Sequence, residues 1–540
     1  MMHKTIIFLL TLLLFCTTDA TSQKTFKNPI LPGFHPDPSI CRVDDDYYMV
    51  TSSFEWFPGL PIFHSKDLVN WEQIGHVLDR PSQLPMKDGL RPSNGLWAPT
   101  IRYHNGLYYV ICTATGCGGN FLVTSKNPQG PYSEPIYIKD APGIDPSLFF
   151  DDNGKVWYCG CINGESKEMP DRYDAEDRIY VQQLDPTTGQ FIGKRHIVSS
   201  GYATNSPYAE APHIYKINGK YYLMIAEGGT WENHAITVFT ADNVTGPYTP
   251  FVCNPVLTHR HLGHDIDITT IGHADLVQTQ YGDWYAVMLG VRPINGYNML
   301  GRETFLTPVS FQGDQPIFNP GIGRVLMEDK FPKLPEAPVK QLPVRDDFDA
   351  SSLNFCWAFL RTPFTRWYQL KDSKLYINLR PQKATELTNP SLIARRVQNS
   401  VFKTITTMHF TPSAPNEEAG MIIMQNYKFQ YRLVLVGNAN GNTELRLIQV
   451  NDGQETIMAS VPYNNHKIVL AIHGNGLKYS FLYGQSANEL KYLKKDTDAT
   501  LCSTNVARGF IGPFVGMYAS SNGLSNETQA AFEWFDYNGE

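Results

Sequence analysis

The chain has 540 residues, a formal net charge of −7 and an aromatic content of 12%. A chain of this length forms more than one domain and can bury a large hydrophobic core. Because the sequence has no basic cluster, its negative charge argues against nucleic acid and anionic membranes as partners.

The first 23 residues have the features of a secretory signal peptide. A basic start precedes an apolar run at 6–15, and the T-D-A sequence at 18–20 supplies small residues for cleavage. The run is too short to anchor the chain in a bilayer. Cys16 follows the bulky Phe15, which favours simple cleavage over a lipoprotein site. We therefore expect an exported protein, periplasmic or extracellular, with no membrane contact after cleavage.

A short unit recurs five times between residues 28 and 325. It joins a strand with an early Pro, a Gly or Asp turn, and a strand with paired aromatics, as in H-P-D-P-S-I…D-D-Y-Y-M-V. If Asp37, Pro99, Asp145, Glu210 and Ala274 are equivalent, the copies lie 62, 46, 65 and 64 residues apart. This repetition predicts an all-β fold over residues 24–326, a five-bladed β-propeller around a central channel.

The last third of the chain predicts a different β-domain. Residues 327–343 are rich in Pro and charge, which is typical of a linker. Strand candidates follow at 374–379, 403–410, 420–425, 431–436, 444–450, 467–473 and 479–483. Their spacing predicts a β-sandwich of jelly-roll type over 344–540. Because this region lacks the repeated carboxylates, we expect it to be an accessory domain.

The cysteines and glycines give no indication of a cofactor. Cys112, Cys159 and Cys161 lie in apolar strand candidates, so we expect most cysteines to be small buried hydrophobes. The sequence has neither zinc-site spacing nor a glycine-rich phosphate loop, and no cofactor is expected to be required.

Three acids occupy the repeated position: Asp37, Asp145 and Glu210. Prolines on both sides hold Asp37 in a rigid segment, although an acid before Pro also caps turns. The small, apolar A-E-A-P context of Glu210 favours a protonated acid. Three carboxylates on one axis would repel one another, so that one keeps its proton. A proton donor beside a base is what hydrolysis of a glycosidic bond requires.

Other residues near the predicted channel suit a sugar site. His273 opens the fifth unit, either as a hydrogen-bonded channel histidine or as a metal ligand. Arg302 can bind hydroxyls or hold a carboxylate, and its neighbour Glu303 offers a local pairing instead. Trp97, Trp56, Phe57 and Trp231 are candidates for stacking on a sugar ring, although any one of them taken alone favours a plain core position.

The strings G-F-H-P-D-P-S, G-I-D-P-S-L-F, Y-A-E-A-P-H-I-Y-K, G-H-A-D-L-V and L-G-R-E-T-F-L resemble glycoside hydrolase family 43. The resemblance covers nearly the whole chain after the leader and is strongest to two-domain β-xylosidase-like members. It implies a five-bladed propeller and an inverting mechanism. In that mechanism Asp37 is the general base, Glu210 is the general acid, and Asp145 tunes and orients the acid.

The resemblance implies further contacts. Arg302 would bind the sugar in the innermost subsite, and His273 would lie under the pocket, where some members hold calcium or another cation. Phe510, from the trailing domain, would close one side of the pocket. Ser520 and Ser521 stand where an acidic residue of a family-type metal site would be expected.

We therefore expect an exo-β-1,4-xylosidase that acts on xylo-oligosaccharides. An α-L-arabinofuranosidase that debranches arabinoxylan or arabinan is the alternative enzyme. A non-catalytic carbohydrate-binding protein is the alternative of another class. The sequence leaves the preferred chain length and the oligomeric state open.

Overall fold

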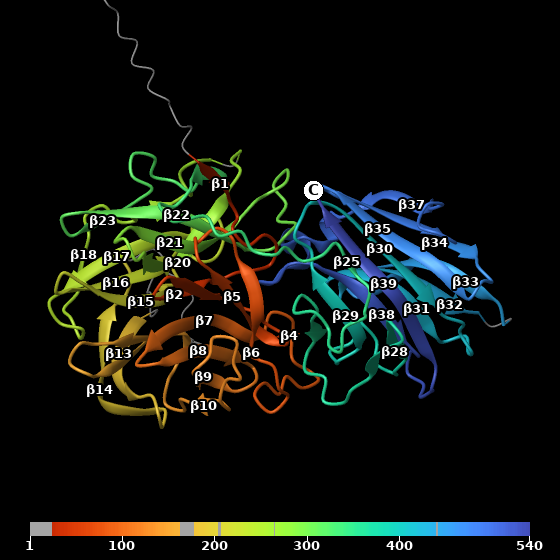
Figure 1. Ribbon diagram of the computed structural model, residues 1–540, viewed down its shortest axis with the longest axis horizontal. Helices are drawn as coiled ribbons and strands as arrows, with labels where there is room; N and C mark the ends of the chain where they lie inside the picture. The colour runs from red at the N-terminus through yellow and green to blue at the C-terminus, as the bar shows by residue number, and fades with distance from the viewer. Residues whose placement is uncertain (1–23, 163–177, 203–206, 264, 439–440) are drawn as a thin grey trace, which may run out of the picture.

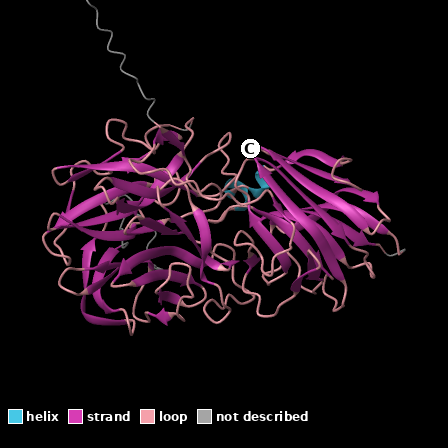
Figure 2. Ribbon diagram, viewed as in Figure 1, coloured by secondary structure: helices cyan, strands magenta, loops and turns pink. Residues whose placement is uncertain are grey.

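The computed structural model describes residues 24–162, 178–202, 207–263, 265–438 and 441–540. These residues form two lobes whose regular secondary structure is almost entirely β-strand (Figures 1 and 2). Their helical elements, η1 (Thr500–Cys502) and α1 (Thr504–Ala507), lie near the boundary between the lobes (Figure 2). The all-β prediction is confirmed, and the predicted signal peptide lies outside the described residues.

The first lobe contains five antiparallel sheets, each built from strands that are near neighbours in sequence. The first sheet contains β2 (Ser39–Val43), β3 (Asp46–Val50), β5 (Gly59–Ser65) and β6 (Glu72–Leu78), and the second contains β7 (Gly95–His104), β8 (Leu107–Thr115), β9 (Gly119–Ser125) and β10 (Ile136–Tyr137). The third contains β11 (Ile144–Phe150), β12 (Val156–Ile162), β13 (Arg178–Asp185) and β14 (Gln190–Ser199), and the fourth contains β15 (Glu210–Ile217), β16 (Lys220–Glu227), β17 (Ala235–Ala241), β18 (Thr249–Pro250) and β19 (Leu257–Thr258). The fifth contains β20 (Thr269–Gln278), β21 (Trp284–Val291), β22 (Glu303–Gln312) and β23 (Gln315–Phe318).

The first strands of these sheets contact one another in a closed order. β2 contacts β7, β7 contacts β11, β11 contacts β15, β15 contacts β20, and β20 contacts β2 again. The five sheets therefore surround one centre, and residues at the start of each first strand come together there.

A buried carboxylate joins four of the sheets at this centre. Asp275 on β20 is 0% exposed and accepts hydrogen bonds from Ser39 Oγ (2.6 Å), Arg102 Nη1 (2.8 Å) and Tyr215 Oη (2.6 Å). Burial alone would raise the pKa of Asp275, but the Arg102 charge and these hydrogen bonds lower it. The bonds tie β20 to the β2, β7 and β15 sheets, so Asp275 holds the ring together.

The second lobe is a pair of facing antiparallel sheets. One contains β25 (Arg345–Asp346), β27 (Tyr368–Lys371), β28 (Lys374–Asn378), β39 (Gln529–Gly539), β30 (Val401–His409), β35 (Lys467–Asn475), β36 (Lys478–Gly484) and β37 (Lys491–Asp498). The other contains β29 (Ser391–Arg396), β38 (Phe514–Ser520), β31 (Glu418–Asn426), β32 (Phe429–Gly437), β33 (Thr443–Asn451) and β34 (Gln454–Pro462). The strands predicted in this region are therefore confirmed, although β25, β27, β29, β34, β37, β38 and β39 were not among them.

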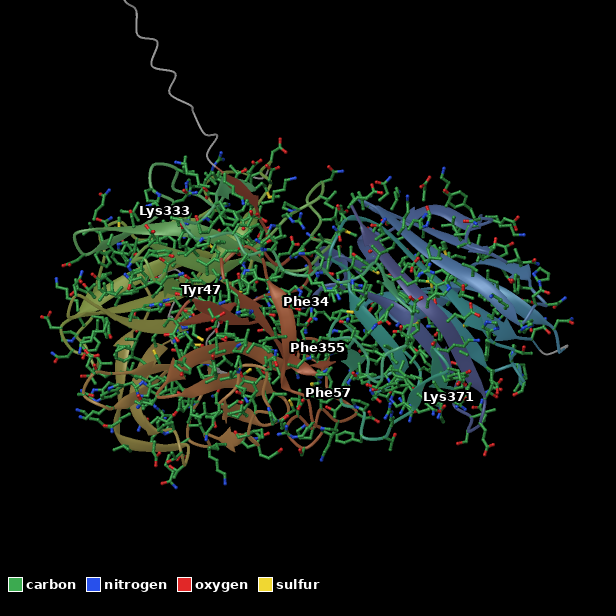
Figure 3. The ribbon with its side chains drawn as sticks, in the orientation of Figure 1. Phe34, Tyr47, Phe57, Lys333, Phe355 and Lys371 are labelled. Carbon is green, nitrogen blue, oxygen red and sulfur yellow. The ribbon has the colours of Figure 1, made fainter. Side chains whose placement is uncertain are left out.

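Two short ladders connect distant parts of the chain. β1 (Thr25–Lys27) pairs with β24 (Glu328–Lys330), so the start of the predicted linker is a strand attached to the first lobe. β4 (Trp56–Phe57) pairs with β26 (Phe359–Leu360) across the boundary between the lobes. One hydrophobic cluster continues from the first lobe into the second. Figure 3 places Phe34 and Phe57 at this boundary. The lobes therefore share a core.

The described part of the chain has no helix with the length and apolarity needed to cross a membrane. Its cysteines are free thiols, and Cys112, Cys159 and Cys161 are fully buried, as expected for small core residues.

Candidate active site

At or near the start of its first strand, each sheet of the ring has a residue in a left-handed backbone conformation at the repeated position, and β20 has a second one, Thr270, with a φ of 64°. Asp37, Ala98, Asp145, Ala211 and His273 have φ angles of 55°, 43°, 53°, 51° and 51°. The strand register shifts at four of these positions, which marks β-bulges. Non-glycine residues rarely adopt this conformation, and when they do they cluster at functional sites. The left-handed residue of each sheet therefore turns one side chain toward the centre of the ring.

This geometry corrects the alignment of the repeats. Ala211, not Glu210, occupies the backbone position equivalent to Asp37 and Asp145. Glu210 is the first residue of β15, one residue earlier, and is partly exposed. The repeat positions assumed at Pro99 and Ala274 each lie one residue after the equivalent positions, which are Ala98 and His273. The third acid thus enters the site from a different backbone position than the two aspartates.

Both carboxylate oxygens of Asp37 are held by the protein. Asp37 is 3% exposed; Arg302 Nη1 donates to Oδ1 at 2.7 Å and Ser52 Oγ donates to Oδ2 at 2.6 Å. Ser52 Oγ in turn accepts from the backbone N–H of Ala98 at 2.7 Å. The orientation of Asp37 is therefore fixed by a charged partner and by a hydroxyl that is itself anchored.

Asp145 is linked to the segment that carries Glu210. The backbone N–H of Ala211 donates to Asp145 Oδ2 at 3.1 Å. Burial raises the pKa of Asp145 to about 6; Asp37 adds to this effect, and the positive charges of His273 and Arg302 oppose it. Asp145 can therefore hold or release a proton in the mildly acidic range while orienting the neighbouring strand.

Arg302 connects Asp37 with the second lobe. Its Nη2 donates to the carbonyl oxygen of Phe510 at 3.4 Å, and its guanidinium lies 5.6 Å and 5.7 Å from the ring centres of Phe54 and Phe510. Its Nε is buried without a hydrogen-bond partner in the described part of the protein. The neighbouring Glu303 pairs with Arg292 instead, so the local pairing considered for Arg302 does not form.

Ser93 joins the aromatic walls from the two lobes. Its backbone carbonyl accepts from Trp97 Nε1 at 2.7 Å, and its hydroxyl accepts from the backbone N–H of Phe510 at 2.9 Å. Its own N–H donates to the buried Glu55 carboxylate at 3.0 Å. The rings of Trp97 and Phe510 meet edge to face, with centres 5.6 Å apart. Trp97 and Phe510 thus form one wall although they come from different lobes.

A cavity of about 600 Å³ opens beside this wall. Its lining includes Trp231 and Arg302 from the first lobe and Thr504, Arg508 and Phe510 from the second. Because Arg302 binds Asp37, the cavity lies next to the acid cluster. Trp231 is 41% exposed, which leaves much of its surface available to a ligand.

The expectation that Trp56 and Phe57 stack on a sugar is wrong. Trp56 is 1% exposed and stacks on Phe514 of the second lobe with ring centres 3.6 Å apart. Phe57 is 5% exposed and pairs with Phe359. Both side chains form the contact between the lobes, and neither has a ring face free for a ligand.

His273 lies in the acid cluster, with Nδ1 3.7 Å from Asp37 Oδ1. A protein-built metal site needs several such ligands around one point. Among the described residues, no group of three or more His, Cys, Asp or Glu side chains is arranged to hold a metal ion. The contact that the structure shows for His273 is with Asp37.

Ser52, Ser93 and Thr230 were missed by the sequence analysis. Thr230 Oγ1 accepts from Arg302 Nη1 at 3.3 Å, and the two serines hold Asp37 and Phe510 as described above. Small hydroxyl residues in loops carry no periodicity. A left-handed φ of 64° at Ser93 marks its loop as constrained, but sequence alone does not reveal this angle.

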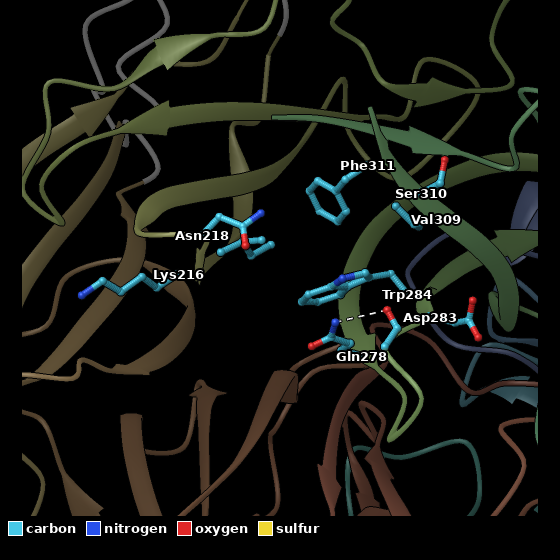
Figure 4. A pocket seen from close by; sticks show the side chains of 10 residues that line it. Lys216, Asn218, Gln278, Asp283, Trp284, Val309, Ser310 and Phe311 are labelled. Atoms are coloured by element: carbon cyan, nitrogen blue, oxygen red, sulfur yellow. Dashed lines mark hydrogen bonds between the residues drawn. The ribbon is translucent and has the colours of Figure 1, made fainter. Parts of the chain in front are cut away.

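A separate cavity of about 480 Å³ lies at the far ends of β15 and β20 (Figure 4). It is lined by Asn218, Gln278, Trp284 and Phe311, and its Asp283 forms an ion pair with Lys333. Neither the three clustered acids nor Arg302, which connects the 600 Å³ cavity to Asp37, lines it, so the catalytic chemistry is not expected there.

Comparison with known proteins agrees with this arrangement. Residues 26–316 match the model of "Glycosyl hydrolases family 43", and residues 345–538 match the "Beta xylosidase C-terminal Concanavalin A-like domain". A protein of Butyrivibrio fibrisolvens named xylosidase/arabinosidase is 38% identical over 94% of this chain and 98% of its own length.

Two relatives from other bacteria are similarly close. The non-reducing end alpha-L-arabinofuranosidase BoGH43B of Bacteroides ovatus is 40% identical over 96% of this chain and 95% of its own length. The crystal structure of a xylan beta-1,4-xylosidase from Bacillus halodurans has a TM-score of 0.89 and 33% identity, over 95% of this chain and all of that one. On both the family model and these relatives, the chain belongs to glycosyl hydrolase family 43.

Proposed function

We propose that this protein is an inverting, exo-acting glycosidase that releases β-xylose from the ends of xylan-derived oligosaccharides. The observation that carries the proposal is the acid cluster. Asp37 and Asp145 occupy equivalent strained positions in two sheets, and the strand that starts with Glu210 is bound to Asp145 through the Ala211 N–H. A pair of acids beside a sugar-sized cavity is what glycoside hydrolysis needs.

In this proposal Asp37 is the general base that activates water. Its contacts with Arg302 and Ser52 leave little freedom to rotate, which suits a base that must aim at one water molecule. Glu210 is the general acid that protonates the leaving oxygen. Asp145 orients the Glu210 segment and modulates the acid, in line with its hydrogen bond to the next residue.

The aromatic wall supports cleavage at chain ends. Phe510 and the segment around Arg508 reach the cavity from the second lobe, so the site is bounded by both lobes rather than by an open groove. Arg302, which lines the cavity, would bind hydroxyls of the terminal sugar, and Trp231 and Phe510 would contact sugar rings, with Trp97 behind Phe510 in the same wall.

An α-L-arabinofuranosidase on arabinoxylan or arabinan is the second candidate, favoured by the name of the Bacteroides ovatus relative. The two sugars present similar hydroxyl geometry, and a pocket discriminates such analogues weakly. A non-catalytic carbohydrate-binding role would require that the acids have no chemical function.

Hydrolysis of matched nitrophenyl β-xylopyranoside and α-L-arabinofuranoside distinguishes these candidates, with Glu210→Ala as the control. We expect release from the xyloside that Glu210→Ala reduces by a factor of roughly 10² to 10⁴, the usual contribution of a general acid. Release only from the arabinoside would make debranching the function. Hydrolysis unaffected by Glu210→Ala would refute the acid assignment, and NMR detection of β-xylose as the first product would refute inversion.

We further infer that the five sheets of the ring are the five blades of a propeller, which the closed order of strand contacts supports. Residues 24–326 would be the catalytic domain and 344–540 the accessory domain, joined by a linker at 327–343 whose first residues, as β24, pair with β1 of the catalytic domain. The leader at 1–23 would direct export to the periplasm or the exterior. No cofactor would be required, and a calcium or other cation near His273 would be held mostly by water.

A further inference from the structure

Two neighbouring arginines are buried at the boundary between the lobes without an acidic partner among the described residues. Arg395 and Arg396 end β29 and are 7% and 6% exposed. No carboxylate of the described residues lies within ion-pair distance of either side chain. A buried charge without a counter-charge is strongly unfavourable, so two of them side by side require an explanation.

Other buried or half-buried arginines of the described chain have a carboxylate partner or several hydrogen bonds. Arg102 pairs with Asp275, Arg302 with Asp37, and Arg432 with Glu418 and Glu455. Arg361 has no ion pair, but its guanidinium makes three hydrogen bonds to main-chain carbonyls.

Arg395 and Arg396 use fewer of their guanidinium N–H donors than Arg361 does. A guanidinium has five N–H donors. Within the described chain, Arg395 donates only to Gln398 Oε1 at 3.0 Å, and Arg396 donates only to the carbonyl oxygen of Phe34 at 2.7 Å. Arg395 Nε is buried and unpartnered. Burial lowers the pKa of Arg396 to about 10, which leaves it charged at neutral pH.

Both arginines line one cavity of about 660 Å³ between the lobes. Arg395 and Arg396 are consecutive on β29, so their side chains leave the strand on opposite faces, and both reach the cavity at the end of the strand. Arg395 lies over the Tyr537 ring at 4.3 Å, and Arg396 lies 5.4 Å from the Phe514 ring centre. Phe355 lines the same cavity at the boundary seen in Figure 3.

The rest of the lining is also suited to an anion. It includes Lys340, Asn399 and His35, whose buried Nδ1 has no partner among the described residues. The carboxylate in the lining, Glu72, is exposed and makes no ion pair with the arginines. Planar guanidiniums bind carboxylates and phosphates through parallel N–H donors.

We propose that the cavity lined by Arg395 and Arg396 binds a small oxyanion, either a carboxylate or a phosphate. The ligand would supply the negative charge that the protein lacks there. Because Arg396 also holds the carbonyl of Phe34, three residues before Asp37, the occupied cavity would support the segment that presents Asp37. The site is distinct from the acid cluster and does not depend on the reaction proposed above.

Calorimetric titration of the full mature chain tests the proposal. Inorganic phosphate and D-glucuronate are titrated separately, against sodium chloride at matched ionic strength. We expect saturable binding of at least one of them at one site per chain, weakened at least tenfold by Arg395→Gln and by Arg396→Gln. Arg366→Gln removes the same charge from an exposed position and is expected to leave binding unchanged.

The two anions separate the sources of ligand. Binding of phosphate alone would assign a phosphate site, and tighter binding of glucuronate would assign a site for acidic sugars. Failure of both to bind, or binding that survives both Gln variants, would overturn the proposal.

A second measurement covers the case in which the Gln variants do not fold. Crystals of the unaltered chain, grown without phosphate or sulfate, are soaked in selenate. An anomalous peak within hydrogen-bond distance of Arg395 and Arg396 is expected. Its absence from the cavity at saturating selenate would also overturn the proposal.

Discussion

Ser52→Ala removes the hydroxyl that fixes one oxygen of Asp37. In the structure Ser52 Oγ donates to Asp37 Oδ2 at 2.6 Å and accepts from the Ala98 N–H at 2.7 Å. The substitution therefore frees Asp37 Oδ2 and leaves a buried N–H without its acceptor. Arg302 still holds Oδ1, so Asp37 is retained in the site but can rotate about its remaining contact.

The size of the effect follows from the two lost bonds. A hydrogen bond to a charged group contributes about 1.5–3 kcal/mol, and an orphaned buried N–H costs about 1–3 kcal/mol. If the first bond serves to aim the base, kcat falls by roughly 10- to 150-fold, since about 1.4 kcal/mol corresponds to a factor of ten. Loss of the acceptor for the Ala98 N–H lowers the free energy of unfolding by about 1–3 kcal/mol.

Ser39→Ala is the matched control. Ser39 Oγ donates to the buried Asp275 at 2.6 Å and accepts from the Ile101 N–H at 3.1 Å, so it makes both kinds of bond outside the acid cluster, together with a longer one from Arg102 Nη1 at 3.2 Å. Steady-state kinetics on the preferred nitrophenyl glycoside and urea unfolding are measured for both variants. We expect similar losses of stability but a loss of kcat only in Ser52→Ala. Equal kcat values in the two variants would refute the role assigned to Ser52.

Two further predictions concern the acids and the aromatics. Since the pKa of Asp145 is about 6 in the folded protein against an ordinary value of 3.8, the folded state binds a proton more tightly, and stability falls as pH rises from about 4 to about 6. Asp145→Asn should flatten this part of the stability profile in urea unfolding between pH 4 and 7; an unchanged slope would contradict the assignment. Trp56→Ala should lower the free energy of unfolding by about 3–5 kcal/mol, because it opens the contact with Phe514. Trp231→Ala should change stability by about 0.5 kcal/mol at most and instead raise KM, and the reverse pattern would show that the two tryptophans have been misassigned.

The ring of sheets could be predicted from sequence because its signal is local. Each sheet is built from strands that follow one another in the chain, and turns and paired aromatics mark them. In the second lobe the buried strand β35 (Lys467–Asn475) was found for the same reason. The edge strand β34 (Gln454–Pro462) was missed because it is exposed on both faces and shows no alternation of polar and apolar residues.

The position of Glu210 shows where sequence repetition misleads. Aligning acid with acid put Glu210 at the place of Asp37 and Asp145, but the repeated property is a left-handed φ, which Ala211 carries. In this chain the strained position is filled by Asp, Ala or His and never by Gly, so residue type gives no indication of it. The acids could be predicted as a set, whereas their register required the structure.

The aromatic residues were harder to assign because their partners are remote in sequence. Trp56 and Trp97 look alike in sequence, yet Trp56 is covered by Phe514 while Trp97 forms one wall with Phe510. Both partners come from the second lobe, more than 400 residues along the chain. Ser93 bonds both Trp97 and Phe510, so docking of the second lobe sets the position of the wall. The sandwich is therefore part of the site: without it, Trp56 would be exposed and the cavity beside Arg302 would lose a side.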